Sequence, residues 1–122
     1  MLLPSLSLDV YTGAAVASFE ISEEDSAVTS YSVNKPAGTQ EGDILIWFGI
    51  FARGGVWGTT APSGFTAIDG AANGGIGGQW GWKEAGASEP SSYSWSITGG
   101  AAPAATLMLR ISNANSSPTI GS

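Results

Sequence analysis

The sequence predicts an all-β fold, an antiparallel β-sandwich of about eight strands with a jelly-roll-like arrangement. Apolar and polar residues alternate along several short segments, clusters of turn-forming residues separate those segments, and no segment carries apolar residues at the period of a helix. The chain has 122 residues, enough for one hydrophobic core, so we expect a single domain over residues 1–122. The Cys and Trp spacing of immunoglobulin domains is missing, which favours the jelly-roll-like form.

The expected strands follow the alternation of apolar and polar residues. They cover residues 6–10, 15–21, 28–33, 44–51, 65–68, 79–83, 92–97 and 106–111. The acidic run 22–26 is interpreted as a turn that ends the second strand. Pro36 and two glycines make residues 35–42 a predicted loop, and the five glycines of residues 70–78 predict another.

Aromatic and apolar residues indicate where the core lies. Residues 44–51 are apolar on both faces of the expected strand, which predicts a central strand covered on both sides. Four of the five tryptophans lie in predicted strands and are expected to pack in the core: Trp47, Trp80, Trp82 and Trp95. Trp57 lies in a Gly-rich loop with little to bury it, so it is the aromatic residue that we expect to contact a partner.

The composition excludes several kinds of chemistry. Cys and His are both absent, which rules out disulfides, Cys or His metal sites and Ser-His-Asp catalysis. Glu84 and Glu89 flank a turn and are the candidates for a pair of catalytic carboxylates, but a solvated turn with an ordinary pKa is the preferred interpretation. We therefore expect no enzymatic activity, no cofactor and no metal.

Negative charge is concentrated in the first third of the chain. The formal net charge is −6, and residues 1–43 contain seven acids and one base, Lys35. Such a chain is a poor partner for nucleic acid or an anionic membrane, and a basic protein surface fits better. Glu23, Glu24 and Asp25 are the candidate contacts. A calcium site formed by these three with Asp43 is the less favoured alternative, because three consecutive acids do not point the same way.

No targeting or membrane segment is expected in the sequence. Residues 1–4 lack the basic start of a signal peptide, and Pro4 interrupts the first apolar residues. The longest apolar stretch, residues 44–52, is far shorter than the twenty or so residues that cross a bilayer. We expect a protein made in a cytoplasm.

An ordered series of motifs resembles a known domain. The series is Ser-Val-Asn-Lys-Pro-Ala-Gly at 32–38, Glu-Gly-Asp-Ile-Leu-Ile at 41–46, Ala-Pro-Ser-Gly-Phe-Thr at 61–66, Trp-Lys-Glu-Ala-Gly-Ala-Ser-Glu-Pro at 82–90 and Tyr-Ser-Trp-Ser at 93–96. It resembles a β-sandwich domain of tailed-bacteriophage virion proteins, found in tail fibres, head fibres and capsid decorations. The family's last strand usually continues through an aromatic and Arg-Gly turn into further strands, whereas this chain reads Leu-Arg-Ile-Ser-Asn at 109–113. Either the domain is trimmed or the chain is the N-terminal part of a longer protein.

The resemblance implies a structural or adhesive role in a virion. The expected function is a non-enzymatic virion protein of the capsid-decoration or head-fibre type, docked on other virion proteins and assembled as a homo-oligomer such as a trimer. The alternative is a carbohydrate-binding adhesion domain of a tail fibre, with Trp57 as the platform for a host glycan. No catalytic residues are implied by the resemblance.

Overall fold

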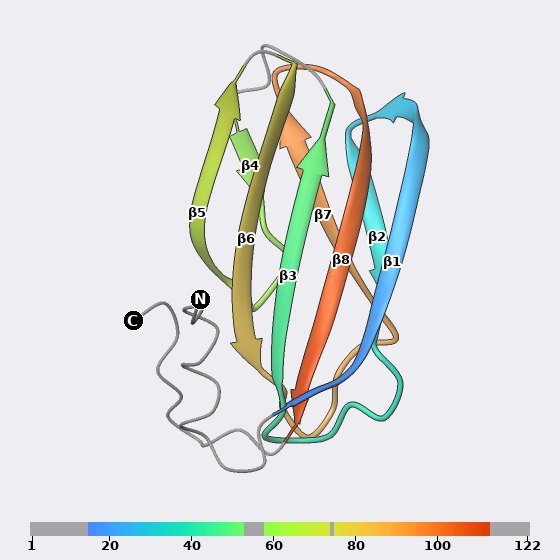
Figure 1. The fold of residues 1–122 in the computed structure, drawn as a ribbon, viewed down its shortest axis with the longest axis vertical. Helices are drawn as coiled ribbons and strands as arrows, with labels where there is room; N and C mark the ends of the chain where they lie inside the picture. Colours follow the sequence, from blue (N-terminus) through green and yellow to red (C-terminus); the bar gives the residue numbers. More distant parts are fainter. Residues whose placement is uncertain (1–14, 53–57, 74, 113–122) are drawn as a thin grey trace, which may run out of the picture.

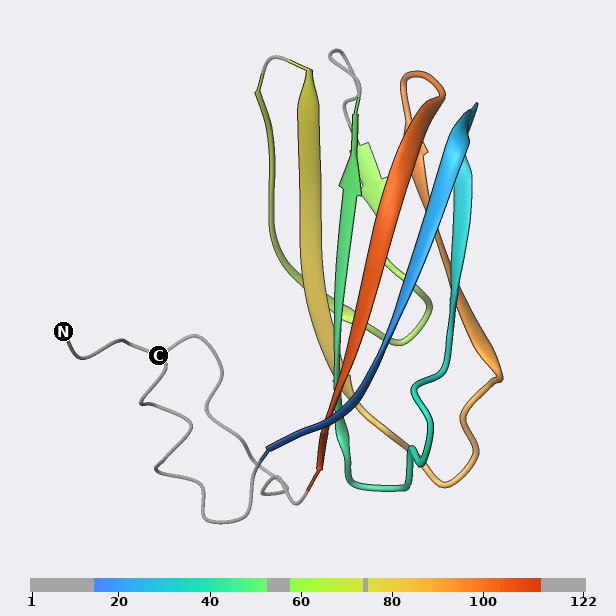
Figure 2. The same ribbon diagram turned by 45° about the vertical axis from the view of Figure 1, so that its right-hand side comes forward.

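The computed structural model describes residues 15–52, 58–73 and 75–112, which form eight β-strands in two antiparallel sheets. The strands are β1 (Ala15–Val28), β2 (Ser30–Asn34), β3 (Ile44–Phe51), β4 (Gly58–Thr60), β5 (Thr66–Asn73), β6 (Ile76–Glu84), β7 (Ser92–Thr98) and β8 (Ala102–Ser112). One sheet has the order β1-β8-β3-β6-β5 and the other has the order β2-β7-β4. The two sheets face each other as the layers of a sandwich (Figures 1 and 2).

The strand pairing is jelly-roll-like, as predicted. β1 pairs with β8, β2 with β7 and β3 with β6, so strands of the first half of the chain pair antiparallel with strands of the second half. β3 also pairs with β8, which makes it the central strand of the larger sheet. The β5–β6 hairpin extends that sheet at one edge, while β4 forms an edge of the smaller sheet.

Two segments that were predicted to be turn or loop are strands. Residues 22–26 continue β1, because their main chain pairs with the long strand β8 as far as Glu24↔Ala104. The ladder then becomes irregular up to Val28, and the Ser26 N–H donates to the Glu24 carboxylate at 2.9 Å. The glycine-rich residues 70–78 belong largely to the β5–β6 hairpin, where Gly70 pairs with Gln79. Backbone hydrogen bonds form this ladder, so glycines can take part in it although they have no side chain.

The predicted strands differ from the observed ones in smaller ways. β4 had no counterpart in the prediction, and β8 begins four residues earlier than expected, at Ala102. The expected strand at 6–10 lies outside the described residues. The loop at 35–42 is confirmed, with a turn in which the Thr39 N–H donates to the Pro36 carbonyl at 3.3 Å.

The core lies between the sheets and centres on three aromatic residues. Trp95 packs against Tyr31 and Trp47, with ring centroids 4.5 and 5.3 Å apart, and its indole N–H donates to Thr106 Oγ1 at 2.7 Å. Gly49 lets the two tryptophans meet, because a Cβ at this position would lie 2.7 Å from the Trp95 ring. The other members of the buried cluster are Val33, Leu45, Phe51, Ala85, Tyr93, Ile97, Ala102 and Met108.

An ion pair anchors the loop that precedes β3. The Asp43 carboxylate accepts hydrogen bonds from Arg110 Nε at 2.8 Å and from the Gln40 N–H at 2.9 Å. Arg110 also donates from Nη1 to the Ala37 carbonyl at 3.2 Å. Both side chains are largely buried, so these bonds fix the loop onto β8 in a site of reduced solvent screening.

Candidate functional site

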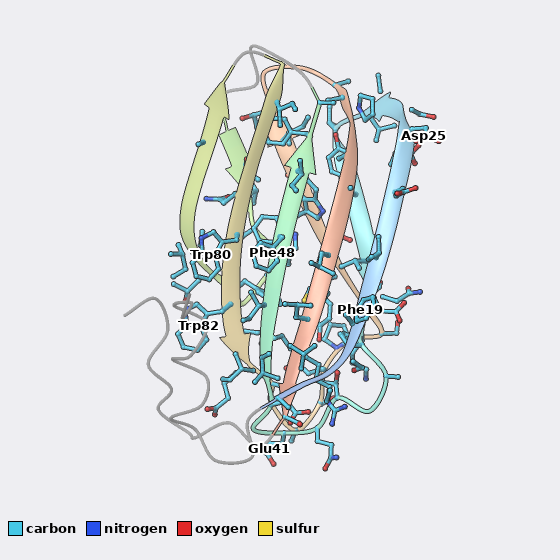
Figure 3. All side chains as sticks on the ribbon, in the orientation of Figure 1. Phe19, Asp25, Glu41, Phe48, Trp80 and Trp82 are labelled. Atoms are coloured by element: carbon cyan, nitrogen blue, oxygen red, sulfur yellow. The ribbon has the colours of Figure 1, made fainter. Side chains whose placement is uncertain are left out.

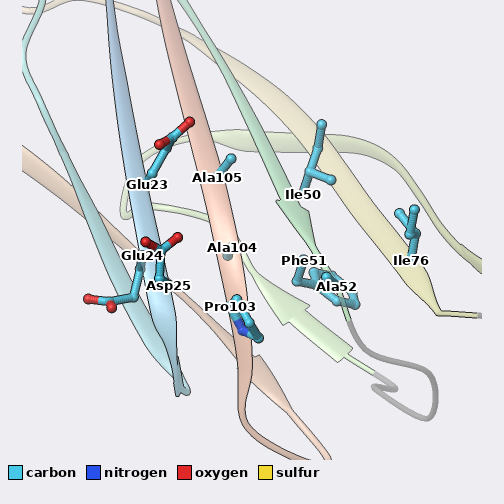
Figure 4. Close-up of a pocket in the computed structure, with 10 residues that line it drawn as sticks. All are labelled: Glu23, Glu24, Asp25, Ile50, Phe51, Ala52, Ile76, Pro103, Ala104 and Ala105. Atoms are coloured by element: carbon cyan, nitrogen blue, oxygen red, sulfur yellow. The ribbon is translucent and has the colours of Figure 1, made fainter.

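The acidic residues predicted to contact a partner lie near one end of edge strand β1. Glu23 and Asp25 are exposed, and Glu24 is half-buried. All three line a hollow of about 300 Å³, which also involves Ile50 on β3 and Ile76 on β6 (Figure 4). The predicted contacts therefore adjoin an apolar surface. The other predicted contact, Trp57, lies outside the described residues.

Asp43 lies far from the other acids considered for a calcium site. Asp43 directly precedes Ile44, which pairs with Ile111 on β8. Glu24 pairs with Ala104, which lies seven residues from Ile111 on the same strand. At about 3.3 Å per residue these positions are roughly 23 Å apart. In the part of the chain that the structure describes, no group of three or more His, Cys, Asp or Glu side chains is placed to hold a metal ion.

Glu89, expected to be a solvated acid, is instead buried. Only 5% of its side chain is exposed. Its carboxylate accepts hydrogen bonds from Lys83 Nζ at 2.9 and 3.1 Å, from the Gly86 N–H at 2.8 Å and from the Tyr93 hydroxyl at 2.8 Å. Burial alone would raise the pKa of Glu89, but these hydrogen bonds and the charge of Lys83 outweigh it and hold the pKa below its usual value. The network fixes the connection between β6 and β7, while Glu84 stays exposed on β6.

This network predicts a pH-dependent contribution to stability. Because the folded pKa of Glu89 is depressed, its contribution is full above the unfolded pKa of about 4.5 and is lost as the pH falls below that value. Burial and the Glu89 hydrogen bond raise the pKa of Tyr93, so its contribution is lost at the other extreme, as the pH rises above about 10. Glu89→Gln is expected to lower the free energy of unfolding near neutral pH by about 2 kcal/mol.

Urea unfolding of the wild type and of Glu89→Gln tests this contribution. The difference between the two proteins is expected to shrink as the pH falls from about 7 to about 3. Glu84→Gln is the matched control, since the Glu84 side chain is exposed. A difference that stays constant over this range would contradict the assigned role of the Glu89 carboxylate.

The main surface feature is the outer face of the five-stranded sheet, here called the apolar face. Its residues form cross-strand rows in which side chains point away from the smaller sheet. The exposed members are Phe19, Ile21, Ile50 and Ile76, each 54–62% exposed. The half-buried members are Ile46, Phe48, Trp80, Trp82, Ala105, Leu107 and Leu109. Figure 3 looks onto this face, with Phe19, Phe48, Trp80 and Trp82 labelled.

Two predictions about the core are therefore wrong. The segment 44–51 is covered along its inner side, where the smaller sheet packs against Leu45, Trp47 and Phe51. Its outer side is not covered throughout, because Ile44 is buried there whereas Ile50 is 54% exposed. Trp80 and Trp82 lie on the apolar face rather than in the core. Trp47 and Trp95 are buried as predicted.

The apolar face is comparable in size to the largest apolar patch found on many monomers. Its members lie on the four strands β1, β8, β3 and β6. Spacings of about 4.8 Å between strands and about 6.8 Å between four rows give a projected area of roughly 300 Å². The largest apolar patch of a monomer is usually about 300–600 Å² and often has a function. The smaller sheet contrasts with it: its outward positions on β2 and β7 are mainly serines, which water solvates.

Comparison with known proteins adds no assignment. No protein-family model matches the chain, and a search of curated proteins finds no relative. No helix in the described ranges is long and apolar enough to cross a membrane. The function is therefore inferred from the residues and their geometry.

Sequence reasoning missed the apolar face because alternation does not say which side of a strand is covered. In β1 the apolar positions Phe19 and Ile21 point outward, although the pattern is that of a half-buried strand. A usable signal was present in β3, whose apolar residues on both faces exceed what one sandwich core can bury.

Proposed function

We propose that this chain is a non-enzymatic structural domain of a phage virion, of the capsid-decoration or head-fibre type, that docks on other virion proteins through the apolar face. The observation that carries the proposal is that large apolar side chains are exposed together on this face, whereas the outward positions of β2 and β7 are mainly serines. The largest apolar patch of a monomer often has a function, and contact with another protein is one such function. The resemblance of the motif series to virion domains supports the same class of function.

The motif residues themselves support a structural role. Asp43, Lys83, Glu89 and Tyr93 all belong to the series, and all take part in the hydrogen bonds that fix the loops at one end of the sandwich. Their spacing is thus explained by folding. A domain with such fixed loops and a free sheet face is suited to display on a particle.

A glycan-binding adhesion domain is the second candidate. Phe48 and Trp80 lie side by side on the apolar face, with ring centroids 6.0 Å apart and planes within 18°, and such a pair offers a platform for a sugar ring. Sugar sites also need hydrogen-bonding groups beside the platform. The neighbouring members of the face, Ile46, Leu107 and Ile50, supply none from their side chains, which favours a protein partner.

Quantitative mass spectrometry of purified virions, produced by a phage encoding this chain, tests the docking function. Wild-type protein is expected at a constant copy number per particle, and Phe19→Asn/Ile21→Asn is expected to lower that number at least tenfold. Ser32→Asn/Ser94→Asn is the control, because it places the same residues on the outer side of the smaller sheet at a cross-strand pair. Absence of the chain from particles would contradict the virion function, and quenching of Trp fluorescence by host polysaccharide would then favour the glycan function.

A further inference from the structure

We propose that the occupant of the apolar face is an amphipathic α-helix of a partner protein, whose apolar stripe lies on the sheet and whose Lys or Arg residues lie beside Glu23 and Asp25. This inference rests on the proposed docking function and specifies the chemistry of the docked segment. Three features of the face carry it: its shape, the apolar side chains of its floor and its charge.

The shape is a shallow groove made of two adjoining hollows. The first, of about 300 Å³, lies between the acidic residues of β1 and the side chains of Ile50 and Ile76 (Figure 4). The second, of about 270 Å³, lies over β3, β6 and β5, where Gly78 leaves space beside Trp80. Ile50 lines both hollows, so they adjoin at this side chain.

The floor of the groove requires an occupant that satisfies its own backbone hydrogen bonds. β8, β3 and β6 each have a strand on both sides, so their backbone groups are already used in ladders. The side chains of Ala105, Ile50 and Phe48 offer no donors or acceptors. A loop or a single strand laid on this floor would bury unpaired N–H and C=O groups, whereas a helix pairs them internally.

The dimensions set the length of the helix. The sheet is five strands wide, and four spacings of about 4.8 Å give a path of roughly 19 Å. At about 1.5 Å per residue, a helix that crosses it needs about 13 residues, or between three and four turns. Apolar side chains at the i, i+3, i+4 and i+7 positions of such a helix would cover the groove.

The charge at one end of the groove favours a basic partner over a second copy of the chain. Glu23 and Asp25 are exposed there. Two bases of this chain, Lys83 and Arg110, are already paired with Glu89 and Asp43. With a formal net charge of −6, a second copy would add repulsion at this end of the groove, whereas Lys or Arg from a partner would reduce it.

Fluorescence anisotropy with designed peptides tests the inference on the intact chain. The probe is a labelled helical peptide of about 14 residues with a leucine stripe and two lysines in its last turn. One comparison peptide has glutamate in place of the lysines, and another has the same residues in a scrambled order. We expect the basic helical peptide to bind at least about fivefold more tightly than either.

Matched variants locate the site. Glu23→Gln is expected to weaken binding of the basic peptide about two- to fivefold, with a larger loss when Asp25→Asn is added. Glu41→Gln is the control, because it removes the same charge at an exposed site that lies at the opposite end of the molecule (Figure 3). Ile50→Asn is expected to reduce the binding of all the peptides, because this exposed side chain lines both hollows.

Several results would overturn the inference. Equal binding of the lysine and glutamate peptides would contradict a basic partner. Equal binding of the scrambled peptide would contradict a helical partner. Dimerisation in sedimentation analysis that Phe19→Asn/Ile21→Asn abolishes would assign the face to a second copy. If no peptide binds but particle occupancy still depends on Phe19 and Ile21, the helix inference fails and the docking function stands. If the chain is absent from particles, the docking function fails.

Discussion

Replacing Trp95 by alanine is expected to lower the free energy of unfolding by about 3–5 kcal/mol. The side chain is 2% exposed and contacts both Tyr31 and Trp47, so its removal leaves a cavity between the two sheets. It also removes the donor to Thr106 Oγ1 in a buried site. Because small domains are stable by only about 5–15 kcal/mol, the variant should be close to unfolding. Urea unfolding followed by circular dichroism measures the loss.

Trp80→Ala is the matched control for Trp95→Ala. Trp80 is half-buried on the apolar face, where its main aromatic contact is with Phe48. We expect a loss of about 1–2 kcal/mol, since an aromatic pair contributes about 0.5–1.5 kcal/mol beyond the area it buries. Equal losses for the two variants would contradict the division of the tryptophans between the core and the apolar face.

Replacing Arg110 by methionine is expected to cost about 3–5 kcal/mol, because it leaves the buried Asp43 carboxylate without its cation. The side chains of the pair are 13% and 9% exposed, so water replaces little of the lost interaction. The loop that Arg110 holds through the Ala37 carbonyl should also loosen. Thermal unfolding and hydrogen exchange of the amides in residues 35–43 measure the two effects.

Two further variants separate the charge effect from packing. Lys35→Met removes a positive charge from a half-exposed side chain in the same loop and should cost less than about 1 kcal/mol. Adding Asp43→Asn to Arg110→Met removes the unpaired charge and should recover a large part of the lost stability. If Arg110→Met costs no more than Lys35→Met, the ion pair does not stabilise the loop.

The fold class could be predicted from the sequence because period-two alternation and turn residues directly reflect strand geometry. Tyr93, Trp95 and Ile97 alternate with serines, and all three are buried as expected. The acidic residues 22–26 were misjudged because charge lowers strand propensity, yet pairing with β8 outweighs that local preference. Likewise, the glycines of the β5–β6 hairpin look like a loop until their ladder is formed.

The candidate site could be predicted only in part. The acidic run was selected by its charge, and it does border the groove. The apolar face was missed because a local sequence pattern does not show how many strands each sheet contains. The number of strands in each sheet decides how much of the larger sheet is covered. Here a three-stranded sheet faces a five-stranded sheet, and the outward sides of β2 and β7 in the smaller sheet are polar. Glu89 was misjudged because its partners, Lys83 and Tyr93, are brought to it by two different strands.

Covalent footprinting of the protein, free and on purified particles, tests the central claim most directly. In the free protein, hydroxyl radicals should modify Phe19, Trp80 and Trp82 on the apolar face, while the buried Trp95 should stay unmodified in both states. The account predicts that docking protects Phe19, Trp80 and Trp82 and leaves exposed side chains elsewhere unchanged. Unchanged modification of these three residues on particles that carry the chain would contradict docking through the apolar face.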